Sequence, residues 1–207
     1  MTTSARLPFP ISMTGDGVHL REWRPDDLQF LVALLDEPEI ARFTPMPSPF
    51  DFEAAEAYLA RAKQARLSGQ RMQLAITVDG GEPLGEVLLF GLNTSRREVE
   101  LGYLVGAQHR RQGLASRSLA LLIGYARHTL GVERLLLRID ASNAASVAVA
   151  RRAGFRITTD PPIQQAGPHG TSSLDTWELV DPRAGSRVNR LRNVATRRYG
   201  RRSRPAE

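Results

Sequence analysis

The sequence predicts an α/β (α+β) domain, a mixed sheet with helices packed on its faces. Two observations support this fold class. Segments with alternating apolar residues are interleaved with segments of helical periodicity, in the order β-α-α-β-β-β-α-β-α-β-β. At 207 residues, the chain is also long enough to bury one sizeable core. We expect the domain to span residues 17–181, between a loose lead-in at 1–16 and a tail at 182–207.

The first half of the domain is expected to contain one strand and two helices. Residues 18–23 alternate as a strand, and Arg24-Pro25-Asp26-Asp27 then ends the strand and favours a helix start. Leucines at helical spacing predict a helix from Leu28 to about Leu35. A second amphipathic helix is expected at 52–67. The three prolines within 44–49 favour a loop between the two helices.

From residue 72 onward, strands predominate. Alternating apolar residues predict strands at 72–78, 84–90, 99–105, 134–139, 155–158 and 173–180. Asp79-Gly80-Gly81 is a turn signal that predicts a hairpin between the first two of these strands. Helical spacing of apolar residues predicts a long helix at 113–130 and a shorter one at 143–153. Residues 160–170 are rich in proline and glycine and are expected to form a loop.

The net charge of +6 is unevenly distributed. Residues 182–207 carry nine arginines against the single acid Glu207, a charge of +8, which leaves −2 for residues 1–181. Any argument from the high isoelectric point therefore concerns the tail alone. The tail is either an RNA or ribosome contact or a solvated extension without such a role, and both interpretations stay open.

Several classes of site are disfavoured by composition. The chain has no cysteine, which excludes disulfides, thiolate metal sites and a cysteine nucleophile. The four histidines share no ligand spacing, so we expect no metal. No apolar stretch approaches the roughly 20 residues of a membrane-spanning helix, and the N-terminus lacks a signal-peptide pattern. We expect a cytoplasmic protein with no membrane contact.

A strand, a short turn and a helix start follow one another from Glu98 to Ala115. The helix opens with Arg110-Arg111-Gln112-Gly113-Leu114-Ala115. Backbone amides of such a turn, together with the helix dipole, form an anion-binding cradle, and the small side chains let a pyrophosphate approach the backbone. The alternative is an arginine-rich surface turn before an ordinary helix.

Residues 98–155 resemble the acetyl-CoA-binding core of the GNAT superfamily of N-acetyltransferases. The matching motifs, in order, are Gly102-Tyr103, Arg110 to Ala115, Asn143-Ala144-Ala145-Ser146 and Gly154-Phe155. The cradle motif ends in alanine where the family pattern allows glycine or alanine. Residues 20–27 also resemble the opening of the ribosomal-protein-alanine N-acetyltransferase branch.

The resemblance implies a mostly antiparallel sheet with helices on both faces and a splayed pair of parallel strands that admits acetyl-CoA. Tyr103, Leu104 and Val105 would pair with the pantetheine arm through their main chain. The pyrophosphate would be held by Arg110, Arg111, Gln112, Gly113, Leu114 and Ala115. Asn143 would hydrogen-bond the pantetheine or the acetyl end, and its alternative role is that of a helix N-cap.

Direct acetyl transfer to an amine needs a base, stabilisation of an oxyanion and a proton for the departing thiolate, but no covalent enzyme intermediate. The resemblance implies Glu100 as the general base, often acting through water, against the alternative of a surface or salt-bridged glutamate. The tyrosine acid of many relatives is replaced by Ala150. Ser146 is therefore our candidate acid, against a serine satisfied locally by backbone. The amide of Leu104 is the candidate oxyanion donor.

The expected acceptor is a primary amine, most plausibly a protein N-terminal α-amine, in a pocket among the first two helices and residues 160–170. Acetylation of a small amine (an antibiotic, a polyamine or an amino acid) is the first alternative. A non-catalytic acetyl-CoA-binding module is the second. The sequence leaves open whether the protein is a monomer or a homodimer.

Overall fold

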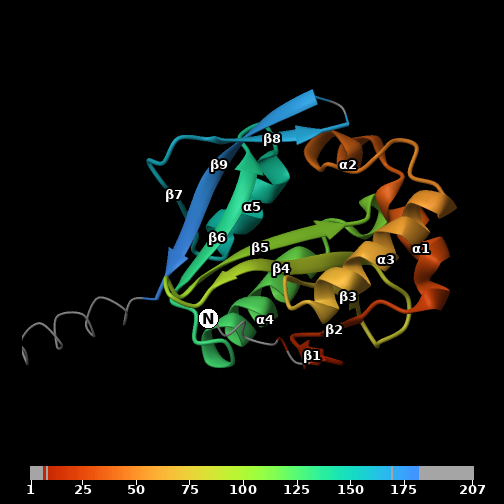
Figure 1. Cartoon of the computed structure of the whole chain (residues 1–207), viewed down its shortest axis with the longest axis horizontal. Helices are drawn as coiled ribbons and strands as arrows, with labels where there is room; N and C mark the ends of the chain where they lie inside the picture. Colours follow the sequence, from red (N-terminus) through yellow and green to blue (C-terminus); the bar gives the residue numbers. More distant parts are fainter. Residues whose placement is uncertain (1–6, 8, 169, 182–207) are drawn as a thin grey trace, which may run out of the picture.

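The computed structural model describes residues 7, 9–168 and 170–181, and within them one mixed sheet organises the molecule (Figure 1). Its strands are β1 Ser12–Gly15, β2 Val18–Glu22, β3 Arg71–Thr77, β4 Gly85–Asn93, β5 Glu98–Val105, β6 Arg134–Asp140, β7 Arg156–Ile157, β8 Ile163–Gly167 and β9 Gly170–Val180. The spatial order is β1-β2-β3-β4-β5-β6-β9-β7, and β8 pairs with β9. The basic tail lies outside the described residues.

Helices cover both faces of the sheet, as predicted. They are α1 Leu28–Leu35, α2 Pro38–Phe43, α3 Phe52–Leu67, α4 Leu114–His128 and α5 Ala144–Arg152, with short 3-10 turns at Pro25–Asp27 and Ala107–His109. Helix α3 packs on β3 and on α1, whereas α4 packs across β2, β4 and β5. In Figure 1, α3 lies in front of the sheet and α4 behind it. The mixed architecture expected from the element order is therefore confirmed.

Three short elements were not predicted. Strand β1 forms within the lead-in, where Ser12 pairs with Arg21 of β2. Helix α2 has only six residues, with Pro38 in its first turn. Strand β8 forms within the expected 160–170 loop and pairs antiparallel with β9. Elements of four to six residues are too short to show a helical or alternating pattern, and their main chain is ordered by pairing and packing instead.

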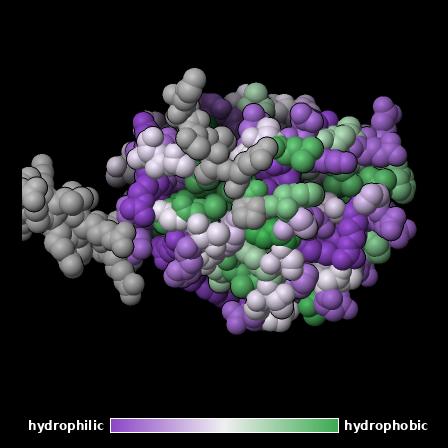
Figure 2. Space-filling view, turned by 60° about the horizontal axis from the view of Figure 1, so that its bottom comes forward, coloured by the Kyte–Doolittle hydropathy of each residue, from purple (hydrophilic) through white to green (hydrophobic). Residues whose placement is uncertain are grey.

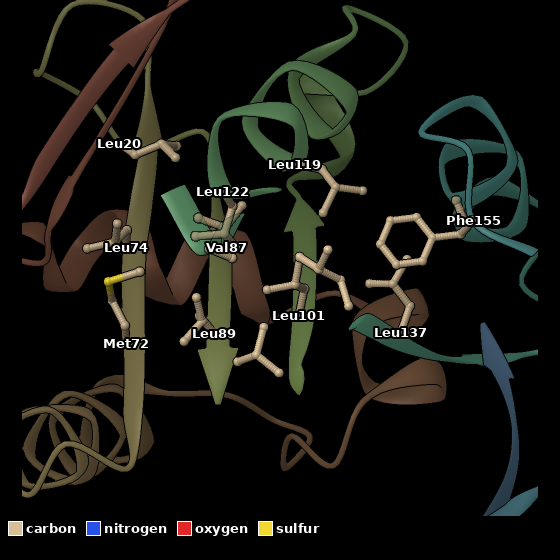
Figure 3. Packing of buried hydrophobic residues seen from close by; sticks show 14 of the residues in the cluster. Leu20, Met72, Leu74, Val87, Leu89, Leu101, Leu119, Leu122, Leu137 and Phe155 are labelled. Atoms are coloured by element: carbon tan, nitrogen blue, oxygen red, sulfur yellow. The ribbon is translucent and has the colours of Figure 1, made fainter. Parts of the chain in front are cut away.

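The main core lies between the sheet and α4. Helix α4 buries residues at helical spacing: Leu114, Ser118, Leu119, Leu122 and Ala126. Figure 3 shows Leu119 and Leu122 pointing from this helix onto leucines and valines of the strands, including Val87 and Leu101. This packing sets α4 firmly against β4 and β5, and so positions the turn from which α4 starts.

A second cluster lies on the opposite face, beneath α1 and α3. Its buried members include Leu31, Phe50 and Tyr58, and the rings of Phe50 and Tyr58 meet edge to face with their centroids 6.0 Å apart. Leu104 of β5 packs against this cluster. The helices of the N-terminal half therefore cover the same end of β5 to which the sequence assigned substrate contacts.

The parallel strands β5 and β6 pair only near their starts. Glu98, Val99 and Glu100 face Arg134, Leu135 and Leu136, yet β5 continues to Val105 and β6 to Asp140. Beyond Glu100, the two strands separate, which Figure 1 shows as the divergence of their arrows. Strand β4 still pairs with β5 as far as Val105. The splayed parallel pair predicted from the resemblance is therefore present.

Within residues 9–168 and 170–181, no helix is both long and apolar enough to span a membrane. Seen from the side of α4, hydrophilic and hydrophobic residues are interspersed over the surface (Figure 2).

Candidate functional site

A cavity of about 610 Å³ lies at the gap between the diverging strands. Its lining residues come from both faces of the sheet, from α2, from the first turns of α4 and α5, and from the loop between β5 and α4. The sequence-predicted site residues that line it are Glu100, Tyr103, Leu104, Val105, Arg110, Arg111, Gly113, Leu114, Ala115, Asn143 and Ser146. Gln112 is not among the lining residues. The fold thus gathers segments from Glu39 to Leu174 around one opening.

The turn before α4 presents unpartnered backbone amides to the cavity. Arg111 has a φ of 62° and Gly113 a φ of 76°, two left-handed residues that bend the chain sharply before the helix. The first helical bond runs from the Arg117 amide to the Gly113 carbonyl. The amides of Leu114, Ala115 and Ser116 are therefore left without a helical acceptor at the positive end of the helix dipole. This is the arrangement that holds a phosphate.

Arg117 secures this turn, a role that the sequence analysis did not assign. Its guanidinium donates to the carbonyl of Gln112 at 3.0 Å and to the carbonyl of Asp16, in the β1–β2 turn, at 2.8 Å. Gln112 thus contributes its main chain to the cradle. The one signal in the sequence was the position of Arg117 one helical turn after Gly113.

Arg110 does not present a free charge to the cavity. Its guanidinium donates to the Val105 carbonyl at 3.2 Å and to Glu37 at 2.9 Å, and it also pairs with Glu39. The backbone amide of Ala107 donates to the same Glu37 carboxylate at 2.7 Å. Arg110 therefore joins the cradle to the start of α2, and its positive charge is balanced by two acids. The exposed Arg111 is the cradle arginine at the rim.

Glu100 combines the two environments that the sequence analysis left open. Its carboxylate accepts from Arg138 Nε at 3.3 Å, so it is salt-bridged, and it also lines the cavity. The side chain is 23% exposed. Burial raises the pKa of Glu100, while the positive charge and hydrogen bond of Arg138 oppose that rise.

Asn143 immediately precedes α5, and Ser146 lies in its first turn. Asn143 Oδ1 accepts from the Ser146 amide at 3.0 Å, which confirms the N-cap role. The hydroxyl of Tyr103 donates to the Ser146 carbonyl at 2.8 Å and so joins β5 to this turn. Burial raises the pKa of the Tyr103 phenol well above its ordinary value, so the phenol stays protonated and remains a donor. Asn143 and Ser146 both line the cavity.

A buried carboxyl that the sequence analysis missed lies on the other side of β5. Glu86 of β4 is 1% exposed and lines the cavity together with Tyr58. Its carboxylate accepts from Trp23 Nε1 at 2.8 Å, from the Tyr58 hydroxyl at 2.6 Å and from Gln73 Nε2 at 3.4 Å. Burial raises the pKa of Glu86 to about 7, although these donors and Arg71 lower it.

The signal for Glu86 in the sequence is faint. It is a lone acid in an apolar strand, at a position where alternation still allowed it to face solvent. Its donors come from three further segments, so only the folded chain shows that it is buried and hydrogen-bonded by neutral groups.

The described ranges contain no group of three or more histidine, aspartate or glutamate side chains placed to hold a metal ion.

Comparison with known proteins gives one matching family model. Residues 18–156 match the model described as the acetyltransferase (GNAT) domain. A mycothiol acetyltransferase from Salinispora tropica is 31% identical over 160 residues, which cover 72% of this chain and 48% of that protein. The chain therefore spans about half the length of this curated relative.

Solved structures share the fold at low identity. One is provisionally assigned as a ribosomal-protein-serine acetyltransferase of Vibrio cholerae, with a TM-score of 0.74, 18% identity, and coverage of 83% of this chain and 98% of that one. Another is Mycobacterium smegmatis RimJ in complex with CoA-disulfide, with a TM-score of 0.69, 18% identity, and coverage of 81% and 83%. At this identity the likeness concerns the fold alone.

Proposed function

Because the chain belongs to the GNAT family of acetyltransferases, we propose that it transfers the acetyl group of acetyl-CoA directly to a primary amine. The observation that carries this proposal is the continuity of the cavity. It joins the unpartnered amides at the start of α4, the unpaired edge of β5 and the carboxyl of Glu100 in one space of about 610 Å³. The reaction needs a site for the phosphates of the cofactor, an extended groove for its arm and a proton acceptor for the amine, and the cavity offers these features one after another along its length.

The residues present fit acetyl-CoA. The unpartnered amides of Leu114, Ala115 and Ser116 and the α4 dipole suit its pyrophosphate. The main chain of Tyr103, Leu104 and Val105, which β6 no longer pairs, suits the amide-bearing pantetheine arm as an added strand. Arg110 supports this site indirectly, because it fixes the loop and the Val105 carbonyl. Asn143 keeps its side-chain amide nitrogen for the pantetheine while its oxygen caps α5.

Acetyl transfer needs a base, a donor to the oxyanion and an acid, and we assign each role to groups that line the cavity. Glu100, through a water molecule, removes the proton of the attacking amine, since burial raises its pKa toward that of an effective base. The amide of Leu104 faces Glu86 in the antiparallel ladder with β4, so the amides of Tyr103 and Val105, on the edge of β5 that β6 does not pair, would instead stabilise the negative charge that develops on the acetyl oxygen. Ser146 donates the proton to the departing thiolate, because its hydroxyl lies on the turn that Asn143 and Tyr103 hold in place. No enzyme nucleophile takes part.

The acceptor we favour is a protein N-terminal α-amine. An α-amine has an ordinary pKa of about 7.7–8.0, so part of it is neutral at physiological pH, whereas a lysine amine has a pKa of about 10.4. The resemblance of residues 20–27 to the ribosomal-protein branch supports this choice. The relatives do not decide it, since one is named for mycothiol and another for a ribosomal protein.

An acceptor panel tests the proposal. Peptides with Ala, Ser and Met N-termini, lysine peptides and small amines are incubated with acetyl-CoA, and free thiol release is followed. We expect turnover with an N-terminal peptide, and a kcat for Glu100→Gln lower by about 10²- to 10⁴-fold. Glu133→Gln is the matched control, because Glu133 pairs with Arg97 and does not line the cavity. Binding of CoA without turnover of any amine would instead mark a non-catalytic module.

The charge of the tail supports a separate proposal about partners. With nine arginines in residues 182–207, this segment has the composition of an RNA contact near the ribosome. Binding of a ribosomal RNA fragment is measured at increasing salt, with the full chain and with residues 182–207 deleted. We expect a steep salt dependence that the deletion abolishes. Equal affinity of the two chains would rule out this role.

A further inference from the structure

Building on the proposed function, we propose that Glu86 is a specificity-determining residue, whose carboxylate receives the cationic amine of the acceptor and holds it beside Leu104. The candidate acid and base of the reaction are other residues. Glu86 therefore adds an acceptor-binding carboxylate to the site, and it selects for acceptors that arrive as a primary ammonium.

The position of Glu86 follows from strand register. Glu86 of β4 is paired with Leu104 of β5, so their side chains lie on the same face of the sheet, with Cβ atoms typically about 5 Å apart. The neighbouring amides of Tyr103 and Val105, on the edge of β5 that β6 does not pair, are the proposed oxyanion donors. Glu100 lies on the same face, four residues earlier on β5. An amine that reaches Glu86 is thus next to the place where the acetyl carbon must lie.

The hydrogen bonds of Glu86 leave room for a ligand. Oε1 accepts from Trp23 and, at 3.4 Å, from Gln73, while Oε2 accepts from Tyr58 alone. A carboxylate oxygen has two lone pairs, so Oε2 can accept one more hydrogen bond. The three donors found in the described part of the chain are neutral. A buried carboxylate with neutral partners gains strongly from a cation, and Arg71, which also lines the cavity, acts on it only through space.

The Glu86 network is held by several elements. Tyr58 of α3 donates to Glu86 and accepts from Gln73 of β3 at 2.7 Å. Trp23 follows β2. These contacts fix the carboxylate in one orientation, which is what discrimination between an ammonium and a neutral group of the same shape requires.

The titration of Glu86 suits an α-amine. The titratable and charged groups that face it are Tyr58 on α3 and Arg71 on β3. Burial raises the pKa of Glu86 to about 7, against the opposing effects of Tyr58, Trp23, Gln73 and Arg71. An α-ammonium has a pKa only about one unit higher, whereas a lysine ammonium lies about three units higher. Between about pH 7 and 8, Glu86 is therefore mostly ionised while part of an α-amine is already neutral, whereas a lysine amine stays almost fully charged. Removal of the proton from the bound amine remains the role of Glu100.

The test measures acceptor binding apart from catalysis. Three probes are each titrated calorimetrically into the protein–CoA complex. They are the tripeptide amide Ala-Ser-Gly-NH₂, the analogue propionyl-Ser-Gly-NH₂, in which a propionyl group replaces the alanyl residue and so removes the amine, and spermidine. We expect Glu86→Gln to weaken binding of the Ala peptide about 10- to 100-fold, the effect of losing one charge-assisted hydrogen bond. The neutral analogue should bind weakly and equally to both proteins. The KM for acetyl-CoA should stay within about twofold.

A pH series adds a readout that a structural role would not move. From pH 6 to 7.5, wild-type affinity for the Ala peptide should rise as Glu86 ionises, and the Glu86→Gln profile should be flat. Tyr58→Phe removes a donor that lowers the pKa of Glu86, so its rise in affinity should move to higher pH. This second variant keeps the test decisive if Glu86→Gln folds poorly.

Glu22→Gln is the structural control, since Glu22 pairs with the buried Arg66 at 2.9 Å and does not line the cavity. It should lower the thermal midpoint without changing peptide affinity. Unchanged peptide affinity in Glu86→Gln, or failure of both amines to bind the wild type, would overturn the inference. Amine binding that depends on Glu86 without acetyl transfer to any amine would overturn the proposed function and leave the binding site standing.

Discussion

Glu86 and Glu100 show how two carboxyls on one face of a sheet acquire different properties. Burial raises the pKa of both groups. Glu100 also meets the guanidinium of Arg138 at 3.3 Å, which favours its charged form, whereas Glu86 has neutral hydrogen-bond partners. Desolvation therefore dominates at Glu86, and a counter-charge limits its effect at Glu100. The identity of a catalytic or binding carboxylate is thus decided by its immediate neighbours.

The raised pKa of Glu86 predicts a pH dependence of stability. Its pKa is about 7 in the folded protein and near 4.5 when unfolded, so the folded state binds this proton more tightly. The stabilisation is fully present below pH 4.5 and is lost as pH rises through 7, a change of about 3 kcal/mol. Glu86→Gln removes this dependence. In urea unfolding, the stability of the variant relative to wild type should increase by about that amount from pH 4.5 to pH 8. A constant difference would contradict the buried titration.

At the scale of elements, the start of α4 is where backbone conformation would serve the proposed binding of a phosphate. Gly113 adopts a φ of 76° as the N-cap of α4, and a Cβ built there would be 3.7 Å from Arg117 Nε, an ordinary contact. The surrounding protein therefore has room for a side chain, but the left-handed backbone and the approach of a phosphate do not favour one.

Gly113→Ala should accordingly destabilise the fold by about 1–2 kcal/mol and weaken CoA binding measured by calorimetry. Gly124→Ala is the matched control on the same helix, where a Cβ would meet open space. That change should stabilise the protein by about 0.5–1 kcal/mol, because alanine is the better helix former, and should leave CoA affinity unchanged. Equal losses of CoA affinity in the two variants would argue against a phosphate site at the turn.

Helix α2 depends on the cradle loop for its position. Arg110 pairs with Glu37 and Glu39, and Glu37 also accepts from the Ala107 amide. A double-mutant cycle of Arg110→Gln and Glu37→Gln should give a coupling free energy of about 1 kcal/mol in urea unfolding, as expected for a partly exposed pair. Because α2 lines the cavity on the side where we place the acceptor, Arg110→Gln should also raise the KM of the amine. Strictly additive effects would show that the two residues act independently.

The whole molecule depends on packing at both faces of the sheet, since the cavity lies where the strands between the two clusters diverge. Leu122 is fully buried between α4 and the strands (Figure 3). Leu122→Ala should lower the free energy of unfolding by about 2–5 kcal/mol, through lost burial and a residual void. Leu67→Ala, at a position 60% exposed, should change it by less than about 0.5 kcal/mol. Similar values for the two variants would contradict the packing of α4 onto the sheet.

Much of this protein could be predicted from the sequence, because much of it is local. The periodicity of α3 and α4, the alternation in β3 to β5 and the amide cradle at 110–115 depend on residues close together in the chain. Helical spacing and left-handed turns are properties of neighbouring residues, so a single sequence carries them. Short elements such as α2 and β8 escaped prediction, since too few residues repeat in them.

Tertiary structure alone decided which groups meet at the cavity. The charge of Arg110 is neutralised by acids more than 70 positions earlier, and Glu86 is enclosed by Trp23, Tyr58 and Gln73 from separate segments. The pKa of a buried carboxyl group depends on its burial and on hydrogen-bond partners that come from distant segments. The residues next to it in the sequence indicate neither of these. The backbone conformation at the start of α4 thus follows from adjacent residues, whereas the charge on Arg110 and the surroundings of Glu86 follow from the folding of the whole chain.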